Sequence, residues 1–92
     1  MLNNAYTKGE RERKVIAIYK RVEDIRKDKT NLSQTDFAKE IGMSYRSYQE
    51  RITGERPKWL VSEIVKASLF NKGKILVDID GREYAVSIKP VE

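Results

Sequence analysis

Apolar residues recur at helical spacing through the first third of the chain. Between Glu10 and Asp28 they form one face, and Arg and Lys crowd the other; the apolar members are Val15, Ile16, Ile18, Tyr19, Val22 and Ile25. This spacing predicts an amphipathic helix over about Glu10–Asp28. Thr7 and Glu10 have the spacing of a capping box at its start, and the polar stretch Asp28–Asn31 ends it.

Two short helices are expected next, each preceded by a serine. Ser33 precedes the helix Gln34–Ile41, which Gly42 ends, because glycine readily takes the left-handed conformation of a helix C-cap. Ser44 precedes a second helix that runs to about Thr53 and is closed by Gly54. Apolar pairs flank both caps at the spacing of a hydrophobic staple: Leu32 with Phe37, and Met43 with Tyr48.

The remaining sequence predicts one more helix and then a change of period. Pro57 suits the first turn of a helix over Lys58–Phe70, which the turn residues Asn71–Gly73 end. Two alternating runs follow, separated by Asp80-Gly81, a strong signal for a hairpin with a type I′ turn. A two-residue loop sets three pairs: Ile79 with Arg82, Val77 with Tyr84, and Ile75 with Val86.

The predicted fold class is therefore mainly α with a C-terminal β-hairpin. We expect one domain over residues 1–92, with a helical core of four to five helices over 10–70 and a hairpin over 74–89. We find no internal repeat and no low-complexity linker.

The middle of the chain carries a longer motif. Gln34-Thr35-Asp36-Phe37-Ala38-Lys39-Glu40-Ile41-Gly42-Met43-Ser44, followed by Tyr48, Gly54 and Pro57, resembles the Xre/Cro family of phage-repressor-like proteins. The resemblance covers about Leu32–Phe70 and implies a helix-turn-helix whose second helix enters the major groove. The sequence departs from the family pattern at Phe37, at Tyr48 and at Arg51-Ile52, where leucine, an aliphatic residue and an aromatic-Glu pair are usual.

The resemblance implies candidate DNA contacts. Base contacts are expected from Tyr45, Arg46, Ser47, Gln49 and Glu50, with Arg46 pairing with guanine, Gln49 with adenine and Glu50 with cytosine N4. Phosphate contacts are expected from Gln34, Ser44, Thr53, Arg56 and Lys58, which would position the protein without reading sequence. The basic residues Lys8, Arg11, Arg13 and Lys14 are more simply solvated charge.

The hairpin is a candidate dimerisation element. Its register puts six large apolar residues on one face, more than a lone hairpin leaves in water: Ile75, Val77, Ile79, Tyr84, Val86 and Ile88. Some Cro-type proteins pair C-terminal strands between subunits, so the resemblance implies a homodimer. A two-fold dimer would set two recognition helices roughly 34 Å apart on a near-palindromic operator. The alternative is a hairpin packed on its own helices, above Trp59 and Leu69.

Composition narrows the function classes. The 92 residues include no cysteine and no histidine, so we expect no thiolate or imidazole metal site, no cofactor and no enzyme. Nineteen Lys and Arg against fourteen Asp and Glu give a net charge of +5, which suits a nucleic-acid partner without requiring one. No apolar stretch approaches the roughly 18 residues of a membrane span, and Met1–Thr7 does not resemble a signal peptide.

We therefore expect a cytoplasmic DNA-binding transcriptional regulator, a repressor by resemblance, in a bacterial or phage-infected cell. Two alternatives remain open. One is the DNA-binding antitoxin of a toxin–antitoxin pair, with the hairpin as the surface that meets a toxin. The other is a protein-interaction module that has lost DNA binding, for which Arg51-Ile52 is the only indication.

Overall fold

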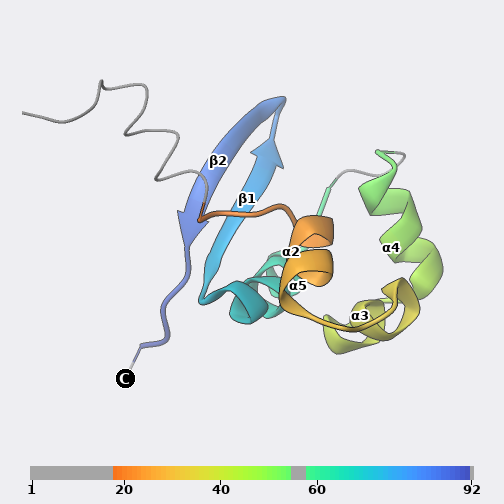
Figure 1. The fold of residues 1–92 in the computed structure, drawn as a ribbon. Helices are drawn as coiled ribbons and strands as arrows, with labels where there is room; N and C mark the ends of the chain where they lie inside the picture. Colours follow the sequence, from red (N-terminus) through yellow and green to blue (C-terminus); the bar gives the residue numbers. More distant parts are fainter. Residues whose placement is uncertain (1–17, 55–57, 92) are drawn as a thin grey trace, which may run out of the picture.

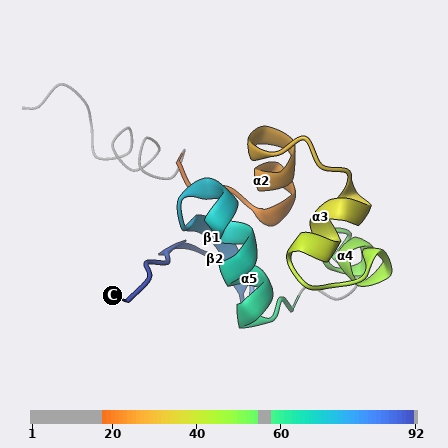
Figure 2. The same ribbon diagram turned by 90° about the horizontal axis from the view of Figure 1, so that it is seen from below.

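Four α helices and a C-terminal antiparallel hairpin make up the described part of the chain. A computed structural model describes residues 18–54 and 58–91. In chain order the elements are α2 (Val22–Lys29), α3 (Gln34–Glu40), α4 (Tyr45–Ile52), α5 (Val61–Ser68), a 3-10 turn η1 (Leu69–Asn71), β1 (Lys74–Ile79) and β2 (Arg82–Ser87). The α3–α4 pair lies on one side of α2, and the hairpin lies on the other (Figure 1). Seen from below, α5 lies under the hairpin (Figure 2).

The prediction of a helix over Glu10–Asp28 is wrong for residues 18–21. Helix α2 begins only at Val22, and the residues just before it are not helical. Lys20 forms a parallel bridge with Ile75, and the Lys20 carbonyl accepts a hydrogen bond from Leu76 N at 2.9 Å. The Asn71 side-chain amide donates a hydrogen bond to Ile18 O at 3.0 Å. These contacts with the C-terminal third keep residues 18–21 out of the helix. The expected helical residues 10–17, the capping box of Thr7 and Glu10, and the basic residues 8–14 lie outside the described residues.

Helices α3 and α4 confirm the predicted pair to within a residue at each end. The Ser33 hydroxyl accepts from Asp36 N at 3.1 Å, and the Ser44 hydroxyl accepts from Ser47 N at 3.1 Å, so both predicted caps form. Gly42 has a φ of +85°, the left-handed conformation that ends α3 and turns the chain directly into α4.

Helix α5 starts later than predicted. It begins at Val61 rather than at Lys58, and the segment 58–60 is not helical. The Leu60 N–H donates to Glu63 Oε1 at 2.9 Å, so the side chain of a glutamate in the first turn caps the helix. The helix therefore does not begin next to Pro57, where the sequence predicted its start. Pro57 itself lies outside the described residues. The helix tightens into η1 and stops where Lys72 and Gly73 adopt positive φ, as the turn signals predicted.

The hairpin has the predicted register and turn. Asp80 and Gly81 have φ of 52° and 82°, as a type I′ turn requires, and the three expected pairs are present. At the open end, Ile88 N donates to Gly73 O at 2.7 Å. A side chain at position 73 would overlap the Ile88 carbonyl, so only glycine fits there.

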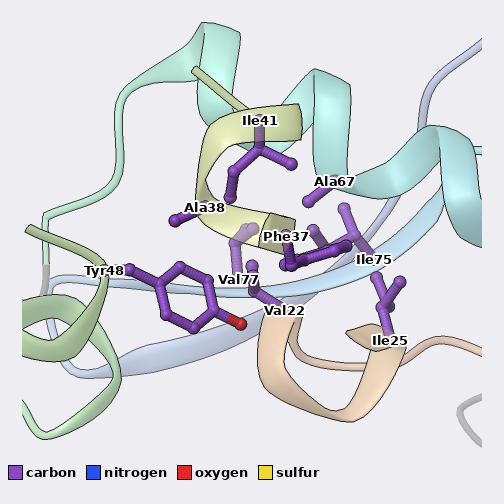
Figure 3. Close-up of a cluster of buried hydrophobic side chains, with 9 residues drawn as sticks. All are labelled: Val22, Ile25, Phe37, Ala38, Ile41, Tyr48, Ala67, Ile75 and Val77. Atoms are coloured by element: carbon purple, nitrogen blue, oxygen red, sulfur yellow. The ribbon is translucent and has the colours of Figure 1, made fainter. Parts of the chain in front are cut away.

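One core joins all of these elements. Its nine buried hydrophobic side chains come from every helix and from β1; they are Val22, Ile25, Phe37, Ala38, Ile41, Tyr48, Ala67, Ile75 and Val77 (Figure 3). The Phe37 ring meets the Tyr48 ring edge-on at 5.9 Å between centroids. Phe37 and Tyr48 are two of the departures from the family pattern, and they pack against each other.

The hairpin packs on the helices of its own chain. Ile75 and Val77 belong to the core, and Val86 and Ile88 pack partly against it. Trp59 also contacts this core, as the intramolecular alternative expected, but Leu69 is exposed. Of the six residues expected to form a dimer surface, only Ile79 and Tyr84 remain largely exposed.

Candidate nucleic-acid interface

The exposed side of α4 carries the residues predicted to contact bases. Tyr48 is fully buried and Ile52 is half-buried against the core, which turns the opposite side of the helix to solvent. Tyr45 is 47% exposed and the Arg46 side chain is 90% exposed. Ser47, Gln49 and Glu50 are half-buried. The five residues expected to read bases therefore divide into two that protrude and three that lie closer to the protein surface.

Arg46 and Glu50 interact with each other along α4. Arg46 Nε lies 3.6 Å from Glu50 Oε2, one helical turn away. This distance is close to the upper limit for a salt bridge, and the pair lies at the surface. Its net stabilisation of the fold is therefore small, at most about 1 kcal/mol. Arg46 can therefore leave Glu50 for a stronger partner at little cost.

The Glu23 carboxylate of α2 gathers three donors from three elements. Arg26 donates to both oxygens, through Nε at 2.9 Å and Nη2 at 2.7 Å. Tyr48 of α4 donates its hydroxyl to Oε1 at 2.6 Å, and Gln34 of α3 donates Nε2 to Oε2 at 2.9 Å. In Figure 3 the Tyr48 hydroxyl points from α4 toward α2. The sequence pattern does not indicate this cluster: the spacing of Glu23 and Arg26 suits a helical ion pair but does not indicate the other two donors.

These contacts fix the charge states. Burial alone would raise the pKa of the Glu23 carboxyl, but hydrogen bonds from Arg26, Tyr48 and Gln34 outweigh it and lower the pKa from 4.5 to about 2. Burial, and then the hydrogen bond to Glu23, raise the pKa of the Tyr48 phenol above its ordinary value. At neutral pH, Glu23 is therefore an anion that only accepts, and Tyr48 is a neutral donor.

The same cluster extends to the exposed side of α4. Gln34 Oε1 accepts a short hydrogen bond from Gln49 Nε2, and the same Gln49 nitrogen donates to the Tyr45 hydroxyl oxygen at 3.0 Å. One predicted phosphate contact, Gln34, and two predicted base contacts, Gln49 and Tyr45, are thus brought together. They form a continuous polar chain, Glu23–Gln34–Gln49–Tyr45, from the interior to the surface.

The other predicted phosphate contacts are less well placed. The hydroxyl of Ser44 donates to Ser47 Oγ at 3.1 Å, and that of Thr53 donates to Gln49 O at 2.8 Å. Lys58 is exposed, but it borders a pocket with Val61, Ile79 and Asp80, near the hairpin. Arg56 lies outside the described residues.

Arg51, a departure from the family pattern, ties α4 to α5. Its Nη2 lies 3.4 Å from Glu63 Oε2, and the two side chains are 14% and 5% exposed. Glu63 is also the residue that caps α5, so one carboxylate links the end of α4 to the start of α5. Arg51 therefore has a structural role and is not one of the exposed residues of α4. Its Nε is buried without a partner among the described residues.

Among residues 18–54 and 58–91, no group of three or more acidic side chains is placed to hold a metal ion. Within the same residues, no helix is both long enough and apolar enough to cross a membrane.

Comparison of the chain with protein-family models, with curated proteins and with solved structures finds no match. The resemblance to the Xre/Cro family therefore rests on the sequence motif.

Proposed function

We propose that this protein is a sequence-specific double-stranded DNA-binding regulator of the Xre/Cro type that reads the major groove with α4. The observation that carries the proposal is the pair of serine-capped helices joined by the left-handed Gly42, with Tyr45 and Arg46 protruding from the first turn of the second helix. A helix-turn-helix presents the N-terminal side chains of its second helix to base edges in the same way.

The internal bracing of this pair also supports the proposal. Glu23 holds α3 through Gln34 and α4 through Tyr48, and the Arg51–Glu63 pair holds the far end of α4. Base readout needs a helix whose side chains are held in place before they bind, because ordering them on binding costs free energy. The net charge of +5 suits a phosphate backbone.

Repression is the regulatory role that we propose, because the resemblance is to phage-repressor-like proteins. A repressor of this size needs only to occupy its operator. The site on DNA would be near-palindromic if the protein binds as a homodimer.

Selection of bound sequences from a random DNA pool tests the proposal. We expect enrichment of one short motif. The affinity should fall steeply as the salt concentration rises, because binding releases counterions from the DNA and added salt opposes that release. Lys58→Ala should flatten the slope of log affinity against log salt by about one unit if Lys58 meets a phosphate. A folded protein that shifts no DNA at low salt would refute DNA binding and favour the protein-interaction alternative. Co-purification of a second small protein from the native operon would favour an antitoxin.

A further inference from the structure

The polar chain from Glu23 to Tyr45 has a fixed hydrogen-bond direction. Glu23 is ionised and accepts only, so Gln34 must turn its NH2 group toward it. The carbonyl oxygen of Gln34 then faces Gln49, which must in turn present its NH2 group. The orientation of each amide is therefore set by the carboxylate, one residue after another.

The direction of the chain determines what reaches the surface. Gln49 uses its nitrogen on Gln34 and on the Tyr45 hydroxyl oxygen, one hydrogen for each. Its own Oε1 has no partner among the described residues and is left as an acceptor. The Tyr45 oxygen accepts from Gln49, so its hydrogen is left to be donated outward.

We infer that Glu23 is a positioning residue that makes Gln49 an acceptor and Tyr45 a donor toward DNA. The inference rests on the proposed function and narrows its specificity. Gln49 then accepts from an exocyclic amine, adenine N6 or cytosine N4, and Tyr45 donates to an acceptor of a neighbouring nucleotide, such as guanine O6, thymine O4 or a phosphate. A bidentate pair of Gln49 with adenine, which the sequence suggested, needs a free NH2 group that this chain does not leave.

Base analogues test the inference in the wild-type protein. The base pair read by Gln49 is the one whose preference is lost in Gln49→Ala after pool selection. We expect adenine or cytosine there, and removal of its exocyclic amine should weaken binding roughly five- to tenfold, the effect of one hydrogen bond. If the base is adenine, replacing N7 by carbon should change affinity by less than about twofold. A guanine or thymine at that position, or an equal loss on replacing N7, would overturn the inference.

Substitution of Glu23 tests the source of the direction. Glutamine at this position can donate as well as accept, so Gln34 and Gln49 are free to turn over. Glu23→Gln should therefore admit guanine or thymine at the base pair read by Gln49. Asp24→Asn makes the same change of charge at an exposed neighbour on α2 and should keep the wild-type preference. An unchanged preference in a folded Glu23→Gln variant would overturn the role of Glu23.

A measurement without DNA separates this inference from the proposed function and does not need a variant at Glu23. In the free wild-type protein, NMR should find slowed hydrogen exchange of the Gln34 and Gln49 side-chain NH2 groups, and Gln34→Ala should abolish the slowing at Gln49. Specific DNA binding together with fast exchange at both amides would overturn this inference alone. Slowed amides together with no DNA binding at low salt would refute the proposed function and leave no bases for the chain to read.

Discussion

The Glu23 carboxylate stabilises the fold only while it is ionised. Its pKa in the folded protein is about 2, below the ordinary 4.5, so its contribution is fully present above pH 4.5 and is lost as the pH falls toward 2. We expect the free energy of unfolding to decrease over this window. Glu23→Gln should remove part of that decrease and lower stability at neutral pH by about 3 kcal/mol, because it leaves Arg26 without its partner.

Urea unfolding at several pH values measures both effects. Glu40→Gln, at an exposed glutamate on α3, is the matched control and should keep the wild-type acid sensitivity. If Glu23→Gln is as sensitive as the wild type between pH 4.5 and 2, the ion cluster does not contribute as described.

Arg46 is the residue on α4 best placed to reach a base. Its side chain is almost fully exposed, and its contact with Glu50 is weak, so Arg46→Ala should leave the stability of the fold nearly unchanged. We expect it to cost about 1–3 kcal/mol of specific binding and to relax the preference at one base pair. Binding titrations and pool selection measure these changes. Lys89→Ala makes the same charge change after the hairpin and should not alter the selected motif; a wild-type motif from Arg46→Ala would contradict a reading role.

At the scale of elements, the hairpin is part of the core of the chain. Ile75 and Ile79 lie on the same strand and the same face, but Ile75 is fully buried and Ile79 is 51% exposed. Ile75→Ala should therefore cost about 2–5 kcal/mol of stability, the usual effect of removing a buried isoleucine. Ile79→Ala, the matched control, should cost less than about 1 kcal/mol. Chemical denaturation of the two variants measures the difference, and equal losses would mean that β1 does not pack as described.

The elements show what sequence patterns can and cannot predict. The α3–α4 pair and the hairpin were predicted nearly residue by residue, because serine caps, Gly42 and Asp80-Gly81 act through local backbone geometry. The predicted start of the first helix was wrong, since Ile18 and Tyr19 fit a helical period but are held out of the helix by contacts with Asn71 and Ser87. Periodicity cannot register a partner that lies far along the chain.

The candidate site was predicted by position but not by chemistry. The sequence indicated which residues of α4 face outward. It could not indicate that Gln34 meets Gln49 and Glu23, because those contacts depend on how three helices cross. The direction of the hydrogen bonds, and hence the base that we propose for Gln49, follows only from those contacts.

At the scale of the whole molecule, the hairpin offers a surface along which two copies can associate. Ile79 and Tyr84 lie on the same face of the hairpin as Ile75 and Val77, but they are exposed. The edge of β2 that does not pair with β1 has no strand beside it among the described residues. We expect a homodimer that pairs along β2, because an open edge and adjacent apolar side chains both favour association.

Sedimentation of the 92-residue protein tests this association. We expect a dimer at tens of micromolar, a concentration well above typical specific DNA-binding constants. Tyr84→Glu should yield a folded monomer, because a charge at an exposed position opposes burial without touching the core. Ala85→Glu, which adds the same charge at the exposed next position on the opposite face of β2, is the matched control. A wild-type monomer at this concentration would refute the dimer.

The pairing of Lys20 with Ile75 has a consequence for how the protein is made. A ribosome releases the chain from its N-terminus, at roughly 5–20 residues per second. The helices α3 and α4 therefore emerge before the strand that supplies Ile75 and Val77 to the core and holds the segment before α2. Until the hairpin has left the ribosome, the nascent α3–α4 pair lacks part of its hydrophobic support. Ribosomes stalled before Lys74 should hold a chain that proteases cut readily. Ribosomes stalled after an added C-terminal linker, long enough to bring the hairpin out of the exit tunnel, should hold a resistant one.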